Sequence, residues 1–195
     1  MSGSIEREIL WTGIGGQGVQ LAARVLALAA TAEGREVMWI GTYGGNMRGG
    51  NTDANVVIAD GPIVAPPLVS RAWGAVVVHP RFFEPMVPKL TAESFVFVDE
   101  DLVEEPLPDT IGTITPIRAT TLAREADAPK AASLVLLGAF AAATGIVAPA
   151  SLEKALANAL PAYRQQSLEA NRRALAVGLD AVPSLSAPAW TSEAA

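Results

Sequence analysis

The sequence predicts an α/β protein in which a mostly parallel, mixed sheet has helices on both faces. Near the N-terminus a strand, a glycine-rich turn and a helix follow one another, and further short apolar runs alternate with helical segments. The 195 residues, half of them hydrophobic, are enough for one domain with its own core. We expect this domain to span residues 1–182 and the Ser-, Pro- and Ala-rich residues 183–195 to form a disordered tail.

The first strand, the apolar run Ile9–Trp11, meets a glycine-rich turn from Gly13 to Gly18 with the sequence Gly-Ile-Gly-Gly-Gln-Gly. An alanine- and leucine-rich helix is expected from Val19 to Glu33. Glycines permit positive φ and close approach to the main chain, and the N–H groups of a helix start favour an anion. The spacing fits the G-x-G-x-x-G pattern of dinucleotide-binding folds, so we expect a Rossmann-like three-layer sandwich and a phosphate or carboxylate at the turn.

Two other interpretations of this turn stay open. A dinucleotide site also needs an acidic residue at the end of the second strand, to bind a ribose hydroxyl. The second strand, Val37–Ile40, instead ends in Gly-Thr-Tyr, and the nearest acid, Glu36, lies at its other end. Ordinary NAD binding is therefore disfavoured. Alternatively, the glycines only let the first helix pack tightly on the sheet.

The link between the second strand and the third, Ala54–Ala59, is rich in glycine and cannot be a crossover helix. A parallel connection normally needs about a dozen residues or more and usually a helix, so the third strand should run antiparallel to the second. Arg48, followed by Gly49 and Gly50, could present its guanidinium to a phosphate, a carboxylate or an acidic residue of another subunit. The alternative is a flexible hairpin tip with a solvated arginine.

After a turn at residues 60–62, a short helical segment is expected from Pro66 to Trp73, followed by a buried strand, Ala75–His79. His79 falls at the carboxyl end of that strand, where open α/β sheets bind ligands. No Asp, Ser or Cys partner stands in a motif with it, so a structural histidine is favoured. Prolines interrupt residues 81–90, which should form a loop or a short irregular helix.

The strand Phe95–Val98 is followed by three acids, residues 99–101. Adjacent carboxylates could bind Mg²⁺, but such sites usually draw ligands from more than one segment, so a solvated strand end is favoured for Asp99 and its neighbours. A last strand is expected at Ile111–Thr115, and a helix from Arg118 to Ala126.

Three helices should complete the domain. The segment Lys130–Thr144 is apolar on nearly all sides, so it should be buried in the core or against another chain. Ser151 is the expected N-cap of a helix that ends near Pro161, and a final helix should run from Tyr163 to Gly178.

The composition excludes several classes of site and partner. The absence of cysteine excludes a disulfide, a thiolate zinc site and a cysteine-ligated iron–sulfur cluster within this chain, and one histidine cannot form a metal cluster. A net charge of -6 and a pI near 4.8 disfavour nucleic acid and anionic membrane as partners. The N-terminus lacks a signal-peptide layout and no apolar stretch is long enough to span a bilayer, so a cytoplasmic protein is expected.

Four segments together resemble the gamma subunit, or gamma domain, of the 2-oxoacid:acceptor oxidoreductases, from about residue 8 to residue 178. This family contains the pyruvate, 2-oxoglutarate, 2-oxoisovalerate and indolepyruvate ferredoxin oxidoreductases. The segments are the glycine-rich turn, Tyr43 with Met47–Gly50, Leu136–Ala139 and Glu169–Asn171.

The resemblance implies a non-catalytic subunit that helps to assemble the complex and, where acyl-CoA is formed, holds coenzyme A near the thiamine site. In the family, the holoenzyme decarboxylates a 2-oxoacid with thiamine diphosphate and passes electrons through iron–sulfur clusters to ferredoxin. The partners implied are the alpha and beta (thiamine-binding) subunits and an iron–sulfur subunit, which hold those cofactors. The cofactor-binding residues implied are Gly13, Gly15, Gly16, Gln17, Gly18, Tyr43, Arg48, Gly49 and Gly50. The alternatives are a free-standing nucleotide-binding protein that uses NAD or a flavin, and a pure assembly module.

Overall fold

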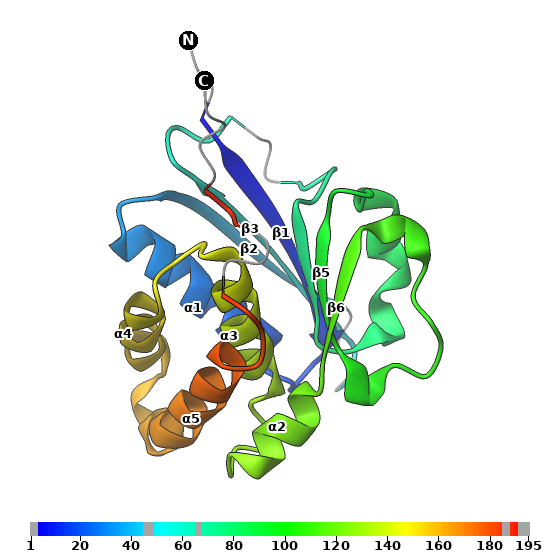
Figure 1. The fold of residues 1–195 in the computed structure, drawn as a ribbon. Helices are drawn as coiled ribbons and strands as arrows, with labels where there is room; N and C mark the ends of the chain where they lie inside the picture. The colour runs from blue at the N-terminus through cyan, green and yellow to red at the C-terminus, as the bar shows by residue number, and fades with distance from the viewer. Residues whose placement is uncertain (1–3, 45–48, 65–67, 185–187, 191–195) are drawn as a thin grey trace.

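The computed structural model describes residues 4–44, 49–64, 68–184 and 188–190. Within them, the chain forms one six-stranded sheet in the order β2-β3-β1-β4-β5-β6 (Figure 1). The strands are β1 (Glu6–Ile14), β2 (Glu36–Tyr43), β3 (Asn51–Ala59), β4 (Gly74–Val77), β5 (Phe95–Asp99) and β6 (Thr113–Ile117). The α-helices are α1 (Val19–Ala32), α2 (Ala119–Glu125), α3 (Ala132–Thr144), α4 (Pro149–Ala159) and α5 (Leu168–Leu179).

The sheet is mixed because β3 runs antiparallel to both of its neighbours, β1 and β2. Strands β1, β4, β5 and β6 pair in parallel. The antiparallel return of the third strand is therefore confirmed, as is the α/β class with a mostly parallel sheet. One consequence matters for function: the start of β3 and the ends of β1, β2 and β4 share one edge of the sheet.

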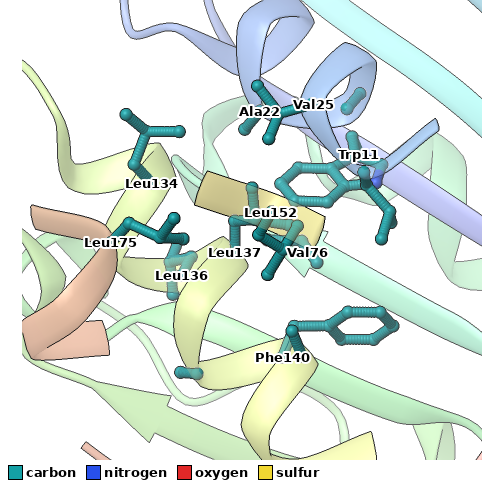
Figure 2. Packing of buried hydrophobic residues seen from close by; sticks show 14 of the residues in the cluster. Trp11, Ala22, Val25, Val76, Leu134, Leu136, Leu137, Phe140, Leu152 and Leu175 are labelled. Carbon is teal, nitrogen blue, oxygen red and sulfur yellow. The ribbon is translucent and has the colours of Figure 1, made fainter. Parts of the chain in front are cut away.

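The five α-helices lie together on one side of the sheet (Figure 1). The core between them and the sheet includes Trp11 of β1, Val25 of α1 and Phe140 of α3 (Figure 2). A smaller core on the opposite face packs Leu10 against residues that include Phe83. Helices thus cover both faces of the sheet, as expected, but those on the opposite face are short 3₁₀ helices.

The opposite face carries short 3₁₀ helices, η1 (Pro80–Phe82) and η2 (Glu84–Lys89). Prolines supply no N–H donor, so the two prolines of η2 prevent a regular α-helix there. The expectation of a short irregular helix at residues 81–90 is confirmed.

Helix α3 is buried on all sides, as its composition predicts, and packs backbone to backbone against α5. A Cβ atom built on Gly138 would lie 2.4 Å from the Leu175 carbonyl oxygen, and one on Gly178 would lie 2.1 Å from the Val135 carbonyl oxygen. Only glycine at both positions allows the two helix axes to come this close. On its other side α3 meets the sheet, where the rings of Phe140 and Phe97 pack edge to face with centroids 5.3 Å apart.

Several element boundaries differ from the expectations. Residues 65–67 are not among those described, and residues 68–73 form bends rather than a helix. Ser151 lies inside α4, which starts at Pro149 with Ala148 as its N-cap, because proline is well suited to the first turn. The last strand starts two residues later than expected, after 3₁₀ helix η4 (Asp109–Ile111) and Gly112, whose φ of 102° turns the chain. The final helical stretch begins as a 3₁₀ helix, η5 (Ala162–Ser167).

Two acids, one at the end of β5 and one just after it, bind the first turn of helix α2. Asp99 is fully buried, and its carboxylate accepts hydrogen bonds from the Thr120 N–H at 3.2 Å and the Thr120 hydroxyl at 2.6 Å. Asp101, in 3₁₀ helix η3 (Glu100–Leu102), accepts from the Thr121 N–H at 2.6 Å. The expectation of a solvated strand end is therefore wrong for Asp99, because its carboxylate binds the first turn of α2.

Two residues near the C-terminus pack on the domain. Ala189 is buried and its N–H donates to the Thr144 carbonyl at 2.7 Å. The Trp190 indole N–H donates to the Ile146 carbonyl at 3.0 Å, and the Arg35 guanidinium lies 3.9 Å from the centre of that ring. The expectation of disorder is therefore wrong for these two residues; residues 185–187 and 191–195 are not among those described.

In the described part of the chain, no helix combines the length and the apolar character that crossing a bilayer requires.

Replacing Gly178 by alanine should destabilise the chain by about 1–3 kcal/mol, the usual range for an overfilled core. The new methyl group would force α3 and α5 apart, although helix propensity alone favours alanine. Urea unfolding of the full chain measures the change, with the exposed Ala176→Ser on the same helix as control. A Gly178→Ala variant as stable as the wild type would show that the two helices can separate without loss.

The pKa of Asp99 is raised, mainly because burial disfavours the carboxylate, although the Thr120 hydrogen bonds act in the opposite direction. An acid whose folded-state pKa lies above its unfolded value, about 3.9, binds its proton more tightly in the folded chain. This contribution to stability is present at low pH and is lost as pH rises through the folded-state pKa.

Asp99→Asn keeps an acceptor for the Thr120 N–H but cannot ionise. Its unfolding free energy relative to the wild type should therefore increase as pH rises from about 3 to about 7. Chemical unfolding at several pH values measures this difference. If the difference does not change with pH, Asp99 does not titrate as its burial implies.

Candidate functional site

The glycine-rich turn lies at the sheet edge where β1 ends, and its own hydrogen bonds hold its shape. The Gln17 N–H donates to the Ile14 carbonyl at 3.1 Å, and the Ile14 N–H donates to the Gln17 side-chain oxygen at 2.8 Å. Gly16 and Gly18 have φ values of 103° and 82°, which other residues rarely adopt. The Gln17 side chain thus supports the turn from within.

The second glycine-rich loop lies directly against this turn. The Gly15 N–H donates to the Gly50 carbonyl at 2.8 Å. A Cβ atom on Gly15 would lie 3.4 Å from both that oxygen and the Thr52 hydroxyl, so the two segments are in close contact. The structure therefore brings together two groups of residues that the sequence analysis singled out separately. Arg48 lies outside the described residues, and for Tyr43 only the backbone at the end of β2 is described.

The space beside both glycine-rich segments is open. Among the described residues, no atom lies within 4 Å of a Cβ atom built on Gly16, or on Gly49 with its φ of 84°. Among the described residues, no acceptor is bound by the N–H of Gly16 or of Gly18. Helix α1 has neither a side-chain cap nor an acidic residue in its first turn. These free N–H groups and the positive end of the helix dipole can hold an anion.

Gly13 has a different part in the site. A Cβ atom there would lie 2.8 Å from Val19 and 3.1 Å from Val78, so this glycine lets α1 pack tightly on the sheet. The packing interpretation therefore describes Gly13, whereas Gly16 faces open space.

Asp53 organises the base of the second loop, and sequence reasoning did not identify it. It accepts hydrogen bonds from the Thr12 hydroxyl and the Asn51 side-chain amide, both at 2.7 Å. The Gln20 amide of α1 donates to the Asp53 backbone carbonyl at 2.5 Å. Asp53 thereby connects β1, β3 and α1. One sequence feature could have indicated Asp53: residues 51, 53 and 55 are polar, so they point to the same face of the strand that follows the glycine-rich loop.

His79 lies after β4 and is held by its own turn. Its Nδ1 accepts the Arg81 N–H at 3.2 Å, so that nitrogen carries no proton. Its pKa is lowered, first by burial and then by the Arg81 charge. His79 and Arg81 also border a cavity of about 520 Å³ on the far side of the sheet from the α-helices, lined further by Phe83, Glu104 and Leu107. No nucleophile is hydrogen-bonded to His79 among the described residues.

Chemically, the described site can bind and orient an anion. Across the described ranges, no three His, Asp or Glu side chains gather in a way that could hold a metal ion. The groups that converge on the turn are backbone N–H donors and a helix start, which stabilise negative charge without exchanging protons.

Comparisons with known proteins agree with this architecture. The family model for pyruvate ferredoxin/flavodoxin oxidoreductase matches residues 8–181. The chain is 33% identical over 160 residues to the 2-oxoglutarate synthase subunit KorC of Methanocaldococcus jannaschii, covering 80% of this chain and 85% of that one. It is 31% identical over 155 residues to the pyruvate/ketoisovalerate oxidoreductases common subunit gamma of Thermococcus litoralis, covering 76% and 84%.

Among solved structures, the keto/oxoacid ferredoxin oxidoreductase gamma subunit of Geobacter sulfurreducens has the same fold. It matches with a TM-score of 0.75 and 28% identity over 89% of this chain and 96% of that one. Apart from the first two residues of β1, the family model covers the sheet, all five α-helices and the two glycine-rich segments. The chain therefore belongs to the pyruvate ferredoxin/flavodoxin oxidoreductase family, and it corresponds to the gamma subunits of 2-oxoacid oxidoreductases.

Proposed function

We propose that this chain is the non-catalytic gamma subunit of a cytoplasmic, thiamine diphosphate- and iron–sulfur-dependent 2-oxoacid:ferredoxin oxidoreductase. The observation that carries the proposal is the family match over residues 8–181. This match includes all six strands, apart from the first two residues of β1. The substrate class is a 2-oxoacid, which the named relatives share. The expected partners are the alpha and beta (thiamine-binding) subunits and an iron–sulfur subunit, with ferredoxin as the acceptor of the whole complex.

The cofactors of the reaction belong to those partners. The sequence contains no cysteine, so this chain offers no thiolate for an iron–sulfur cluster. When bound in its own subunit, thiamine diphosphate supplies the carbanion that allows a 2-oxoacid to lose carbon dioxide. The present chain contributes binding, orientation and assembly.

Coenzyme A is the ligand we propose for the glycine-rich site. Its phosphates are anions, and the N–H groups of Gly16 and Gly18 together with the start of α1 fit an anion. The open space beside Gly16 and Gly49 gives such a ligand access to the main chain. In this proposal Arg48 adds a guanidinium from the second loop.

A free-standing NAD-binding protein fits the site less well. The acid at this sheet edge is Asp53, on β3, and both of its carboxylate oxygens already accept hydrogen bonds, from Thr12 and Asn51. No acidic residue ends β2. The residue type and position that bind a nicotinamide-cofactor ribose are therefore missing.

The complex can be tested directly. We expect a tagged chain purified anaerobically from its native host to carry the thiamine-binding and iron–sulfur subunits, identified by mass spectrometry. The purified assembly should reduce a redox dye only when a 2-oxoacid is present. Recovery of the chain alone with a bound nucleotide would instead support a free-standing nucleotide-binding protein.

The Arg48→Ala variant distinguishes between two hypotheses, a ligand-binding subunit and a pure assembly module. Losing a charge-assisted hydrogen bond should weaken coenzyme A binding by about tenfold or more and leave co-purification of the partners unchanged. Arg24→Ala, at an exposed position on α1, is the control. Loss of the partners with no change in coenzyme A affinity would favour the assembly module.

A further inference from the structure

Strand β2 is an open edge of the sheet, and its sequence does nothing to protect it. Among the described residues β2 pairs only with β3, and β6 forms the opposite edge (Figure 1). An edge strand offers N–H and C=O groups to another strand unless proline, charge or a covering element prevents pairing. The five-residue β6 contains Pro116, which has no N–H to donate. The eight-residue β2 contains no proline, and Glu36 is its single charged residue.

The strand register shows which backbone groups of β2 face outward. The Gly44 N–H donates to the Asn51 carbonyl at 2.8 Å, so these two residues form a hydrogen-bonded pair. In an antiparallel ladder such pairs alternate with pairs that make no hydrogen bond. The even-numbered residues of β2 therefore bond to β3, whereas Val37, Trp39 and Gly41 direct their N–H and C=O groups away from the sheet. In the described part of the chain, no strand lies on that side.

The side chains of β2 are those of an interface. Trp39, at the middle of the strand, is 40% exposed, and the residues beside it, Met38 and Ile40, are apolar and only partly buried. Tryptophan is enriched among the residues that contribute most to protein–protein binding. A long apolar edge with an exposed tryptophan at its centre indicates that another strand covers it in the assembled protein.

The sequence of β2 is complementary to itself when two copies run antiparallel about a two-fold axis at Trp39. Val37 then lies opposite Gly41 of the second copy, so every outward-facing residue meets another outward-facing residue. The large valine side chain is matched with a glycine. At the end of the strand Glu36 lies opposite Thr42 of the second copy, so that no two carboxylates oppose one another.

We propose that two copies of this chain pair through their β2 edges, antiparallel and centred on Trp39, to form one continuous sheet. This isologous contact leaves only the two β6 strands as edges, and Pro116 protects each of them, so association stops at two copies. The match of β2 with itself favours a second copy over a strand of another subunit. The proposal does not depend on the proposed function.

A cysteine at residue 39 tests the pairing directly, because the sequence contains no other cysteine. Cα atoms of a hydrogen-bonded antiparallel pair lie about 5.5 Å apart, a separation that a disulfide spans. We expect oxidation of full-length Trp39→Cys to give mostly covalent dimers, as measured by gel electrophoresis without reductant. Thr42→Cys is the matched control. Its two copies would lie about 20 Å apart, at about 3.4 Å per residue, and should stay unlinked.

Analytical ultracentrifugation of the full-length chain measures the association without a cross-link. The wild type should sediment at twice its chain mass of 20.2 kDa. Trp39→Pro removes an outward N–H and should be a monomer with an unchanged circular dichroism spectrum, because proline is tolerated where an edge N–H faces solvent. Trp39→Lys keeps this N–H but places two like charges at the axis, so it should also be a monomer. Trp39→Phe keeps both the N–H and an aromatic ring and should remain a dimer.

Several results would overturn the proposal. They are a monomeric wild type, a folded Trp39→Pro that is still a dimer, and equal cross-linking of the two cysteine variants. If the wild type is a monomer and Trp39→Pro instead loses partner subunits from the anaerobically purified complex, β2 binds a strand of another subunit and the second copy is wrong. None of these results alters the proposed function, which subunit co-purification and coenzyme A affinity test separately.

Discussion

The backbone contact between α3 and α5 is the constraint on which the rest of the helical layer depends. Glycine at residues 138 and 178 lets the two helices meet without side chains between them, so α3 can lie deep against the sheet. Its opposite side then packs Phe140 and its apolar neighbours onto the strands (Figure 2). Because an α-helix is rigid along its length, a fixed depth also fixes where its first turn lies. That turn lies beside Gly18, at the glycine-rich site.

The helix N-termini near the glycine-rich site differ in whether a carboxylate of the chain binds them. Asp99 at the end of β5 and Asp101 just after it accept hydrogen bonds from N–H groups at the start of α2, and their negative charge neutralises the positive end of its dipole. In the part of the chain that the structure describes, the first turns of α1 and α3 contain no acid, so they keep a positive potential. Asp53, the acid closest along the chain to the glycine-rich loops, is engaged by Thr12 and Asn51. The distribution of carboxylates therefore favours an external anion at one place on the molecule.

This division of charge agrees with the proposed function, in which this chain binds a ligand and the partner subunits carry out the bond-breaking chemistry. The site consists of backbone donors, glycines and a helix start, which position a charged group but do not transfer protons. A binding subunit of this kind needs accurate loop placement, and the Gly15–Gly50 hydrogen bond together with the Asp53 network provides it.

The sequence alone determined the α/β class, the antiparallel third strand, the buried apolar helix and the anion-favouring turn, because each follows from local periodicity, loop composition or backbone freedom. It did not show that Asp99 caps α2, that Asp53 supports the second loop, that Trp190 returns to the core or that Ser133 meets Gly18. Each of these depends on a contact between residues far apart in the chain. Such contacts exist only once the strands have paired and the helices have packed, and local sequence pattern carries no information about the resulting distances.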